Sequence, residues 1–475
     1  MGSRLGEGQR KTMSSDEANL SDYNRRDFIK GSSAATIMTM LGGVPLFAQT
    51  NQTAAGEEKK PLVKVKVAVI GLGTWGREIL NTLARVDEAD IAAVCDTFPS
   101  SLKRGATIAP KAIQTNDYKT ILSNPDVKSV IIATPTHKHK EIVLAALKAG
   151  KHVYCEAPLA NTIEDARTIA LAAKAAKTQV FQTGLQLRSD PERNFLVPFI
   201  RSGAMGEVVM ARSQWNKKTS WWVTAPSSER EKELNWRLDK DVSLGLIGEI
   251  GSHQLDQANW FLNARPKSIT GFGSVLAYTQ DGRQIPDTIQ AIIQYPRGVN
   301  LTYNATLANS FDASYDMFYG TFAAIMLRPD HKTGDDKAWL FKEADSTLLG
   351  WEIYAKKDTF YEETGIQLVA GASKSVQTKK VPVPGEITVN TALSTSFKNF
   401  LMNVADVNKN VDQFIELYGK DYDPNDLIQN LATLVKRPSA GFLEGYQATV
   451  TAVKAHEAVM GGKKVEISKD LYELA

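Results

Sequence analysis

The chain has 475 residues, of which 43% are hydrophobic and 23% charged, and this composition excludes a disordered tail protein. Its 56 basic and 53 acidic residues give a net charge of only +3, which argues against a nucleic-acid partner. The two cysteines exclude a disulfide scaffold, and the six histidines form no HExxH pair, so we expect no metal site.

The first 48 residues have the pattern of an export signal. Arg25 and Arg26 precede an interrupted apolar run at 34–48, which is shorter than the about 20 residues that span a bilayer. This pattern predicts a twin-arginine signal cleaved after Ala48, followed by a flexible leader at 49–62. We therefore expect export in the folded state to the periplasm or the cell exterior, without membrane insertion after cleavage.

A β-branched stretch at 63–70 predicts a strand that runs into the glycine-rich sequence GLGTWG at 71–76 and then into a helix. Glycines at such a junction let backbone N–H groups approach a pyrophosphate. The loop residues assigned to the cofactor are Gly71, Leu72, Gly73, Thr74 and Trp75. Asp96 ends the next strand and is placed to bind a ribose diol, which favours NAD. The sequence leaves NADP open, because Ser100, Ser101, Lys103 and Arg104 could hold a 2′-phosphate.

Further helix and strand units follow, with strands at 130–133 and 152–155 and a helix at 140–149 between them. This alternation predicts a doubly wound parallel sheet of the Rossmann type, with ligands beyond the carboxyl ends of its strands. Cys95 and Cys155 fall at such ends, and we interpret them as buried free thiols.

Several motifs together resemble one enzyme family. They are the sequences at 133–139 (ATPTHKH), 150–159 (GKHVYCEAPL), 235–237 (NWR) and 251–256 (GSHQLD). The chain resembles the Gfo/Idh/MocA family of glucose-fructose oxidoreductase and inositol dehydrogenase. The resemblance implies an NAD(P)-binding domain at 63–185 and a substrate-binding and oligomerisation domain at 186–475. It also implies a cofactor site that includes Thr134, Pro135, His139, Glu156 and Ala157.

Two departures from the family pattern concern the chemistry. Ala157 stands where the family has a lysine that stabilises the developing alkoxide, and Glu249 replaces the aspartate that precedes the motif histidine. His253 is the predicted general acid/base, because an imidazole exchanges protons near neutral pH. Glu249 and Asp256 share its helical face and could orient the ring. Either Lys217 or Lys218 could supply the missing cation.

Other residues are assigned to the substrate. Arg188, Trp236, Arg237 and Asp256 are the candidates, since aromatic rings stack on sugar faces and charged groups bind hydroxyls.

Beyond residue 188 long strands dominate. They are expected at 208–215, 268–278, 288–295, 299–307 and 317–327. They predict an α+β domain with an open, mainly antiparallel sheet, closed by helices at 390–403 and 441–460, with an insertion of unknown role at 404–437. The exposed face of an open sheet predicts a homo-oligomer.

Taken together, these features predict an exported NAD-dependent oxidoreductase acting on a sugar, with tightly held cofactor. Two alternatives remain open. One is an NAD-dependent glycosidase that oxidises its substrate transiently, with Glu249 or a tyrosine as second acid/base. The other is a non-catalytic sugar-binding or sensory protein.

Overall fold

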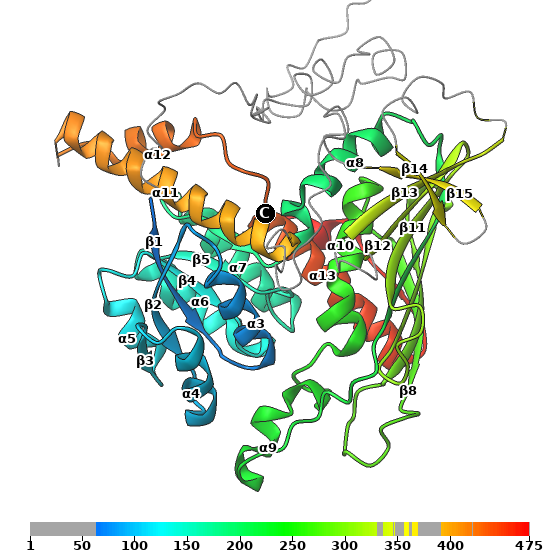
Figure 1. Cartoon of the computed structure of the whole chain (residues 1–475), viewed down its shortest axis with the longest axis horizontal. Helices are drawn as coiled ribbons and strands as arrows, with labels where there is room; N and C mark the ends of the chain where they lie inside the picture. Colours follow the sequence, from blue (N-terminus) through cyan, green and yellow to red (C-terminus); the bar gives the residue numbers. More distant parts are fainter. Residues whose placement is uncertain are drawn as a thin grey trace, which may run out of the picture.

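The computed structural model describes residues 63–329, 336–344, 346, 356–360, 363–368, 391–419 and 421–474. The predicted signal at 1–48 and the leader at 49–62 lie outside them. Figure 1 shows two sheets side by side, the first in blue and cyan and the second in green and yellow, with helices between them. Among the described helices, none has the length and apolar character needed to cross a membrane.

The first sheet has six parallel strands in the order β3-β2-β1-β4-β5-β6, which confirms the predicted doubly wound fold. Its strands are β1 (Val65–Ile70), β2 (Ala89–Cys95), β3 (Ile113–Thr115), β4 (Ser129–Ile132), β5 (His152–Cys155) and β6 (Phe181–Thr183). The connecting helices are α3 (Thr74–Leu83), α4 (Pro99–Ile108), α5 (Tyr118–Ser123), α6 (His139–Lys148) and α7 (Ile163–Ala175). The order reverses between β1 and β4, and in doubly wound sheets ligands bind beyond the carboxyl ends of the strands at such a point.

The second sheet has ten strands and is antiparallel except for the pair β7 and β10, as predicted. Its strands are β7 (Val208–Asn216), β8 (Ser268–Ser274), β9 (Thr288–Gln294), β10 (Asn300–Thr306), β11 (Ser314–Gly320), β12 (Ala323–Pro329), β13 (Asp336–Lys342), β14 (Lys356–Phe360), β15 (Glu363–Leu368) and β16 (Lys464–Glu466). The helices α10 (Gly251–Phe261) and α13 (Phe442–Gly461) pack on its inner face and share one core with it.

One predicted strand is divided into two, and another ends earlier than expected. The strand predicted at 317–327 is in fact β11 and β12, because the backbone turns at Thr321 and Phe322, whose N–H groups bond to the carbonyls of Glu207 and Met205. The strand predicted at 268–278 stops at Ser274, since the N–H groups of residues 276–278 donate to the Asp287 carboxylate. In both cases a distant segment takes the hydrogen bonds that a longer strand would use.

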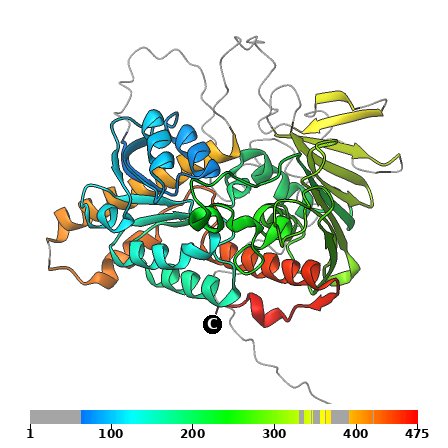
Figure 2. The same cartoon turned by 90° about the horizontal axis from the view of Figure 1, so that it is seen from below.

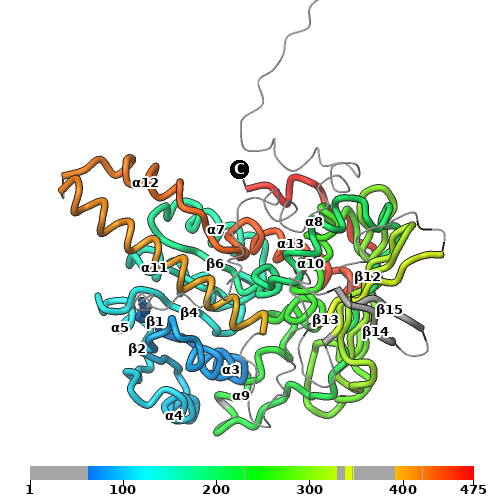
Figure 3. The backbone as a smooth tube through the Cα atoms, turned by 45° about the horizontal axis from the view of Figure 1, so that its top comes forward, coloured from blue at the N-terminus to red at the C-terminus, as the bar shows by residue number. Residues whose placement is uncertain are grey.

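The helix expected at 390–403 is longer and lies elsewhere than expected. It is α11 (Ala392–Tyr418), followed by α12 (Pro424–Ala432), and together they account for most of the predicted insertion. α11 packs on the first sheet, where the ring of Phe397 lies 5.0 Å from that of Tyr154 on β5. Figures 1 and 3 show this helix, in orange, alongside the first sheet and α3, and in Figure 2 it runs from the outer edge of the nucleotide-binding half toward the middle of the molecule. It completes the core of the nucleotide-binding half.

His152 fastens α11 to β5 and makes the fold sensitive to acid. Its Nδ1 accepts a hydrogen bond from Val180 N at 2.8 Å, so the ring is neutral and its Nε2 donates to Asn408 Oδ1 at 3.0 Å. Burial lowers the pKa of His152 to about 4, against 6.5 in an unfolded chain.

Between pH 6.5 and 4 the unfolded chain therefore binds a proton at His152 that the folded protein does not. Its contribution to the free energy of unfolding is fully present above pH 6.5 and falls by about 3 kcal/mol at most as the pH drops to 4. Urea unfolding at pH 7 and 4.5 measures this loss. His152→Gln is expected to show a smaller difference between the two pH values, and an equal difference in both proteins would contradict the assignment.

Candidate active site

The glycine-rich loop between β1 and α3 has a backbone that only glycine permits. Gly71 has a φ of +96°, and a Cβ there would lie 2.6 Å from the carbonyl oxygen of Ala133. A Cβ at Gly76 would lie 1.9 Å from the carbonyl oxygen of Gly71. Gly73, the residue before α3, faces open space within 4 Å, and no side chain caps this helix. The first N–H groups of α3, from Thr74 onward, are thus available to an anion.

Asp96 holds this loop in place from the end of β2. Its Oδ2 accepts from Leu72 N at 2.7 Å and its Oδ1 from Phe98 N at 2.8 Å. Each carboxylate oxygen can accept more than one hydrogen bond, so the predicted contact with a ribose diol is compatible with these two. Asp96 therefore fixes the conformation of the glycine-rich loop and can still bind the predicted ribose.

The segment after β4 carries three of the predicted cofactor residues. His139 is buried between two carbonyl oxygens, with Nδ1 3.1 Å from that of Pro158 and Nε2 3.0 Å from that of Thr134. Burial lowers the pKa of His139 to about 4, so the ring is neutral, carries one N–H and donates to one of these two carbonyl oxygens while the other nitrogen only contacts its oxygen. Pro135 begins the short 3₁₀ turn at Thr136–Lys138, and the Thr134 hydroxyl is buried without a protein partner.

Glu156 follows β5 and is a buried carboxyl beside the glycine loop. Burial raises its pKa to about 8, although the side chain of Trp75 and the Ala157 amide act in the opposite direction. Its Oε1 has no hydrogen-bond partner among the described residues, and a Cβ at Gly184 would lie 2.7 Å from its Oε2. Glu156 is therefore protonated at neutral pH and retains an unused oxygen at the carboxyl end of the sheet.

Ala157 packs against the small apolar cluster of Leu185, Ala440 and Ala448. Lys217 and Lys218 are exposed residues that follow β7. Their backbone N–H groups bond to Thr306 O and Ser310 Oγ, respectively. The replacement of the missing lysine by either of them stays a prediction.

Glu249 and His253 lie where a turn of π-helix, Leu246–Ile250, leads into α10. Such turns recur at functional sites. Glu249 Oε2 accepts from the Thr136 hydroxyl at 2.9 Å and its Oε1 from Leu244 N at 3.1 Å. Its hydrogen bonds therefore join the second domain to the loop after β4, and do not orient the His253 ring.

His253 is partly buried on the first turn of α10, and its Nδ1 has no partner among the described residues. Burial lowers the pKa of His253 to about 4, with Asp256 acting in the opposite direction. The imidazole is thus neutral at pH 7 and able to accept a proton. Glu249, four residues before His253 in the sequence, contacts Thr136 in the loop after β4.

His137 lies in the family motif at 133–139, but the sequence assigns it no role in the site. The structure places its ring against Trp236, a predicted substrate residue. Its ring meets that of Trp236 edge-on at 6.0 Å, and its Nδ1 is buried without a partner. The partly buried Arg237 lies 4.5 Å from the Trp236 ring centroid and close to the charge of Glu249. In the sequence, membership of the motif is the one feature that points to His137. Its contact with Trp236 cannot be predicted, because it forms only when the nucleotide-binding half and the second domain pack together.

Arg188 and Asp256 form a buried two-pronged ion pair, with Nε to Oδ2 at 2.7 Å and Nη2 to Oδ1 at 2.9 Å. The guanidinium also lies 5.1 Å from the ring centroid of Trp260. The guanidinium of Arg188 and the carboxylate of Asp256 thus use hydrogen bonds on each other that a substrate would otherwise receive. A direct role of either residue in substrate binding stays a prediction.

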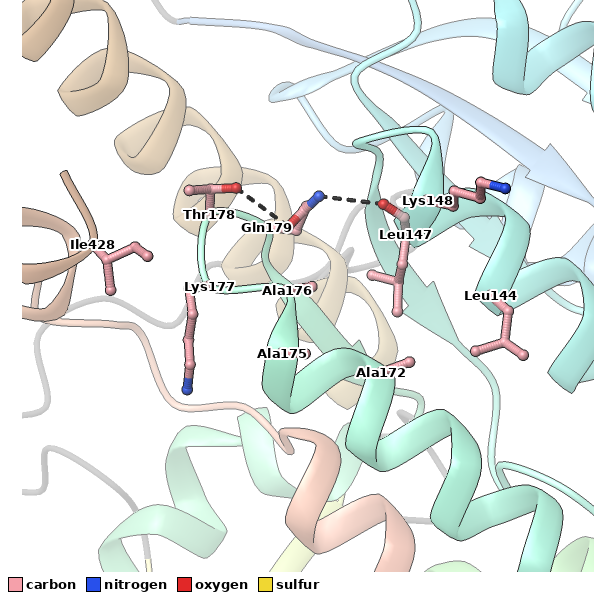
Figure 4. Close-up of a pocket in the computed structure, with 10 residues that line it drawn as sticks. All are labelled: Leu144, Leu147, Lys148, Ala172, Ala175, Ala176, Lys177, Thr178, Gln179 and Ile428. Carbon is pink, nitrogen blue, oxygen red and sulfur yellow. Dashed lines mark hydrogen bonds between the residues drawn. The ribbon is translucent and has the colours of Figure 1, made fainter. Parts of the chain in front are cut away.

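An open hollow of about 530 Å³ lies elsewhere, at the C-terminal ends of α6 and α7 beside Ile428 of α12 (Figure 4). Helices that follow parallel strands run backwards, so their C-termini lie at the edge of the sheet opposite the glycine loop. Lys148 and Lys177 are its charged lining residues, and their amino groups point away from one another in Figure 4. We do not assign this hollow to the active site.

Comparison with known proteins decides the family. Residues 65–184 match the model described as "Oxidoreductase family, NAD-binding Rossmann fold", and residues 198–325 match the "GFO/IDH/MocA C-terminal domain". The chain belongs to the Gfo/Idh/MocA family. This Gfo/Idh/MocA protein is 34% identical to levoglucosan dehydrogenase of Pseudarthrobacter phenanthrenivorans over 149 residues, which are 31% of this chain and 36% of that protein.

A second relative is the 2,7-anhydro-N-acetylneuraminate hydratase of Escherichia coli, 27% identical over 274 residues, which are 57% of this chain and 69% of that protein. Among solved structures, levoglucosan dehydrogenase in complex with NADH and levoglucosan has a TM-score of 0.61 and 19% identity, covering 86% of this chain and 100% of that one. At that identity the similarity shows the Gfo/Idh/MocA fold alone.

The residues present fit an NAD molecule. The uncapped start of α3 and the open side of Gly73 suit a pyrophosphate, and Asp96 suits the adenosine ribose. At the other end, the buried Thr134 hydroxyl and Glu156 Oε1 both lack protein partners. Unpartnered buried polar atoms are costly unless a ligand or water bonds to them, so these two would hold the nicotinamide end.

Proposed function

We propose that this protein oxidises a hydroxyl group of a sugar or sugar-derived polyol with NAD, using His253 as the general acid/base. The observation that carries the proposal is the neutral His253 imidazole, whose Nδ1 has no partner among the described residues and which follows by four residues the Glu249 that bonds to Thr136 after β4. The names of the sugar-related relatives support the substrate class, and the family supports the reaction class.

In this mechanism each residue has a separate task. A bound nicotinamide supplies the acceptor for the hydride that leaves the hydroxyl-bearing carbon. The His253 imidazole takes up the hydroxyl proton, so no alkoxide needs to persist. Trp236 provides an apolar wall beside His137, and the partly buried Arg237 next to it lies within the electrostatic reach of Glu249. Ala157 cannot stabilise negative charge, so proton removal by His253 carries more of the barrier than it would beside a lysine.

A spectrophotometric assay tests the proposal. Purified protein with NAD⁺ is mixed with a panel of sugars, anhydrosugars and inositols, and absorbance at about 340 nm is followed. A substrate-dependent rise supports the dehydrogenase. Calorimetric binding of a sugar without any rise would favour the sugar-binding or sensory protein.

A redox-neutral lyase or glycosidase is the second candidate. Two titratable groups have pKa values pushed apart, Glu156 up to about 8 and His253 down to about 4, which suits an acid and a base working in one cycle. The E. coli relative is named a hydratase, a reaction without net oxidation. Release of aglycone from aryl glycosides without added NAD would favour this candidate over simple dehydrogenation.

Export and cofactor retention belong to the same proposal. A twin-arginine signal at 1–48 would deliver the folded protein, with NAD already inside, to a compartment without a cofactor pool. Fractionation of cells that produce the full chain, compared with Arg25→Lys and Arg26→Lys together, tests export. Absorbance at about 260 nm beyond that of the polypeptide, in protein purified without added NAD, tests retention.

We also propose a homo-oligomer formed through the outer face of the ten-stranded sheet. Met210, Phe272 and Ile292 project from that face with 42%, 63% and 51% of their surfaces exposed, while their strand neighbours Ala211 and Ile293 are buried. Exposed large apolar side chains on the face of an open sheet favour an interaction site there. Light scattering should give a multiple of the chain mass for the wild type and a single chain mass for Ile292→Lys.

A further inference from the structure

A short helix from the second domain reaches the adenosine end of the nucleotide-binding half. This helix, α9 (Ser228–Leu234), follows β7 in the chain. Arg230 on α9 donates from Nη1 to the Thr97 carbonyl and from Nη2 to the Thr97 hydroxyl, both at 3.2 Å. Its guanidinium carbon lies 3.4 Å from the centroid of the Phe98 ring. The contact therefore joins α9 to the two residues that follow Asp96.

Those two residues are next to the part of a nucleotide that distinguishes NAD from NADP. In a Rossmann fold the acidic residue after β2 binds the adenosine ribose, and a nearby arginine is the usual partner of a 2′-phosphate. Arg230 stands in that neighbourhood, yet it comes from the second domain and from a segment outside the family motifs.

The charge of Arg230 is already matched by Glu233 on the next turn of α9. Glu233 Oε2 accepts from Nε at 3.1 Å and from Nη2 at 3.0 Å, and its Oε1 accepts from the Thr97 hydroxyl at 3.3 Å. Burial raises the pKa of Asp96, with Glu233 adding to the shift and Arg230 opposing it. Arg77 also lies within the electrostatic reach of Asp96 and of Arg104, so the two carboxylates do not outnumber the nearby cations. The effect of Glu233 is on the guanidinium of Arg230 that it contacts.

We propose that α9 forms the outer wall of the adenosine subsite, and that Glu233 selects NAD over NADP by occupying the guanidinium that would otherwise bind a 2′-phosphate. The inference rests on the NAD site and deepens the proposed function, because it assigns cofactor choice to a residue of the second domain. A 2′-phosphate would meet the Asp96 and Glu233 carboxylates here, and an arginine with four of its five N–H donors already used.

Equilibrium binding of NAD⁺ and NADP⁺, followed by calorimetry, tests the proposal without any substrate. Glu233→Ala is expected to tighten NADP⁺ binding by at least about tenfold and to change NAD⁺ binding by less than about threefold. Glu231→Ala removes the same charge from an exposed position of α9 and is the matched control, expected to change neither affinity beyond about twofold.

The double variant Arg230→Ala/Glu233→Ala separates a freed arginine from a general loss of negative charge. It is expected to lose the NADP⁺ gain of Glu233→Ala, because no guanidinium remains to bind the phosphate. An unchanged NADP⁺ affinity in Glu233→Ala, or an equal gain in the double variant, would overturn the proposal. Thermal unfolding of each apoprotein verifies that the variants fold. A wild type that binds NAD⁺ but oxidises no sugar would refute the proposed function, and the nucleotide-binding test of Glu233 would still be decisive.

Discussion

Replacing His253 by alanine is expected to lower kcat for sugar oxidation by about 10²–10⁴-fold, the usual contribution of a positioned proton acceptor. With Ala157 in place of a lysine, the described residues around the site offer little else to stabilise the negative charge on the hydroxyl oxygen. NAD⁺ affinity should change by less than about threefold, because the glycine loop and Asp96 lie on the other half of the molecule. Steady-state kinetics and nucleotide titration of the same preparations measure both effects.

The pH profile makes the His253 prediction sharper. Burial lowers its pKa to about 4, so the reactive neutral imidazole persists as the pH falls from 8 to 5 and is lost only near 4. The wild-type kcat/KM should therefore show no loss near pH 6.5, where an exposed histidine titrates. An alanine variant with the wild-type rate would remove His253 from the mechanism, and an acid limb near pH 6.5 would contradict its buried, neutral state.

Replacing Phe397 by alanine is expected to destabilise the protein by about 3–5 kcal/mol, the range for truncating a fully buried aromatic residue. Its ring is 0% exposed and lies between α11 and β5, against Tyr154. Ser396 beside it also accepts from Gln182 Nε2 at 2.9 Å, so loss of the ring loosens a polar contact as well. Urea unfolding, monitored by far-ultraviolet circular dichroism, measures the change.

Leu417→Ala is the matched control, because this side chain is on the same helix but 73% exposed. Its effect should stay within about 0.5 kcal/mol. Similar losses for the two variants would contradict the assignment of the Phe397 effect to its packing on β5, since alanine itself favours the helix.

The first half of the molecule was predictable because its signals are local. A β-branched strand, the glycines at 71–76 and an acid at the end of the next strand follow one another within about 35 residues, and each has one structural meaning. The position of Gly71 against the Ala133 carbonyl then follows from the crossover to β4. The family motifs added Glu156 and His253, whose burial no spacing could reveal.

Contacts between distant segments account for what the sequence did not predict. Nothing in the periodicity of 392–418 says that this helix packs on β5, because its apolar face would suit either sheet. The split at 321–322 depends on hydrogen bonds to residues more than 100 positions away. The sequence gives no reason to single out Arg230 or His137, because the contacts that distinguish them are with residues of the other half of the molecule.

The position of α11 also bears on the order in which the chain acquires its structure. Tyr154 and the other apolar residues of the first sheet that face Phe397 and Phe400 are synthesised about 240 residues before those partners. The nucleotide-binding half is thus a discontinuous folding unit, and a fragment ending at residue 185 would leave that face uncovered. On the ribosome it can finish folding only when synthesis is nearly complete, so during most of translation a chaperone has an apolar surface to bind.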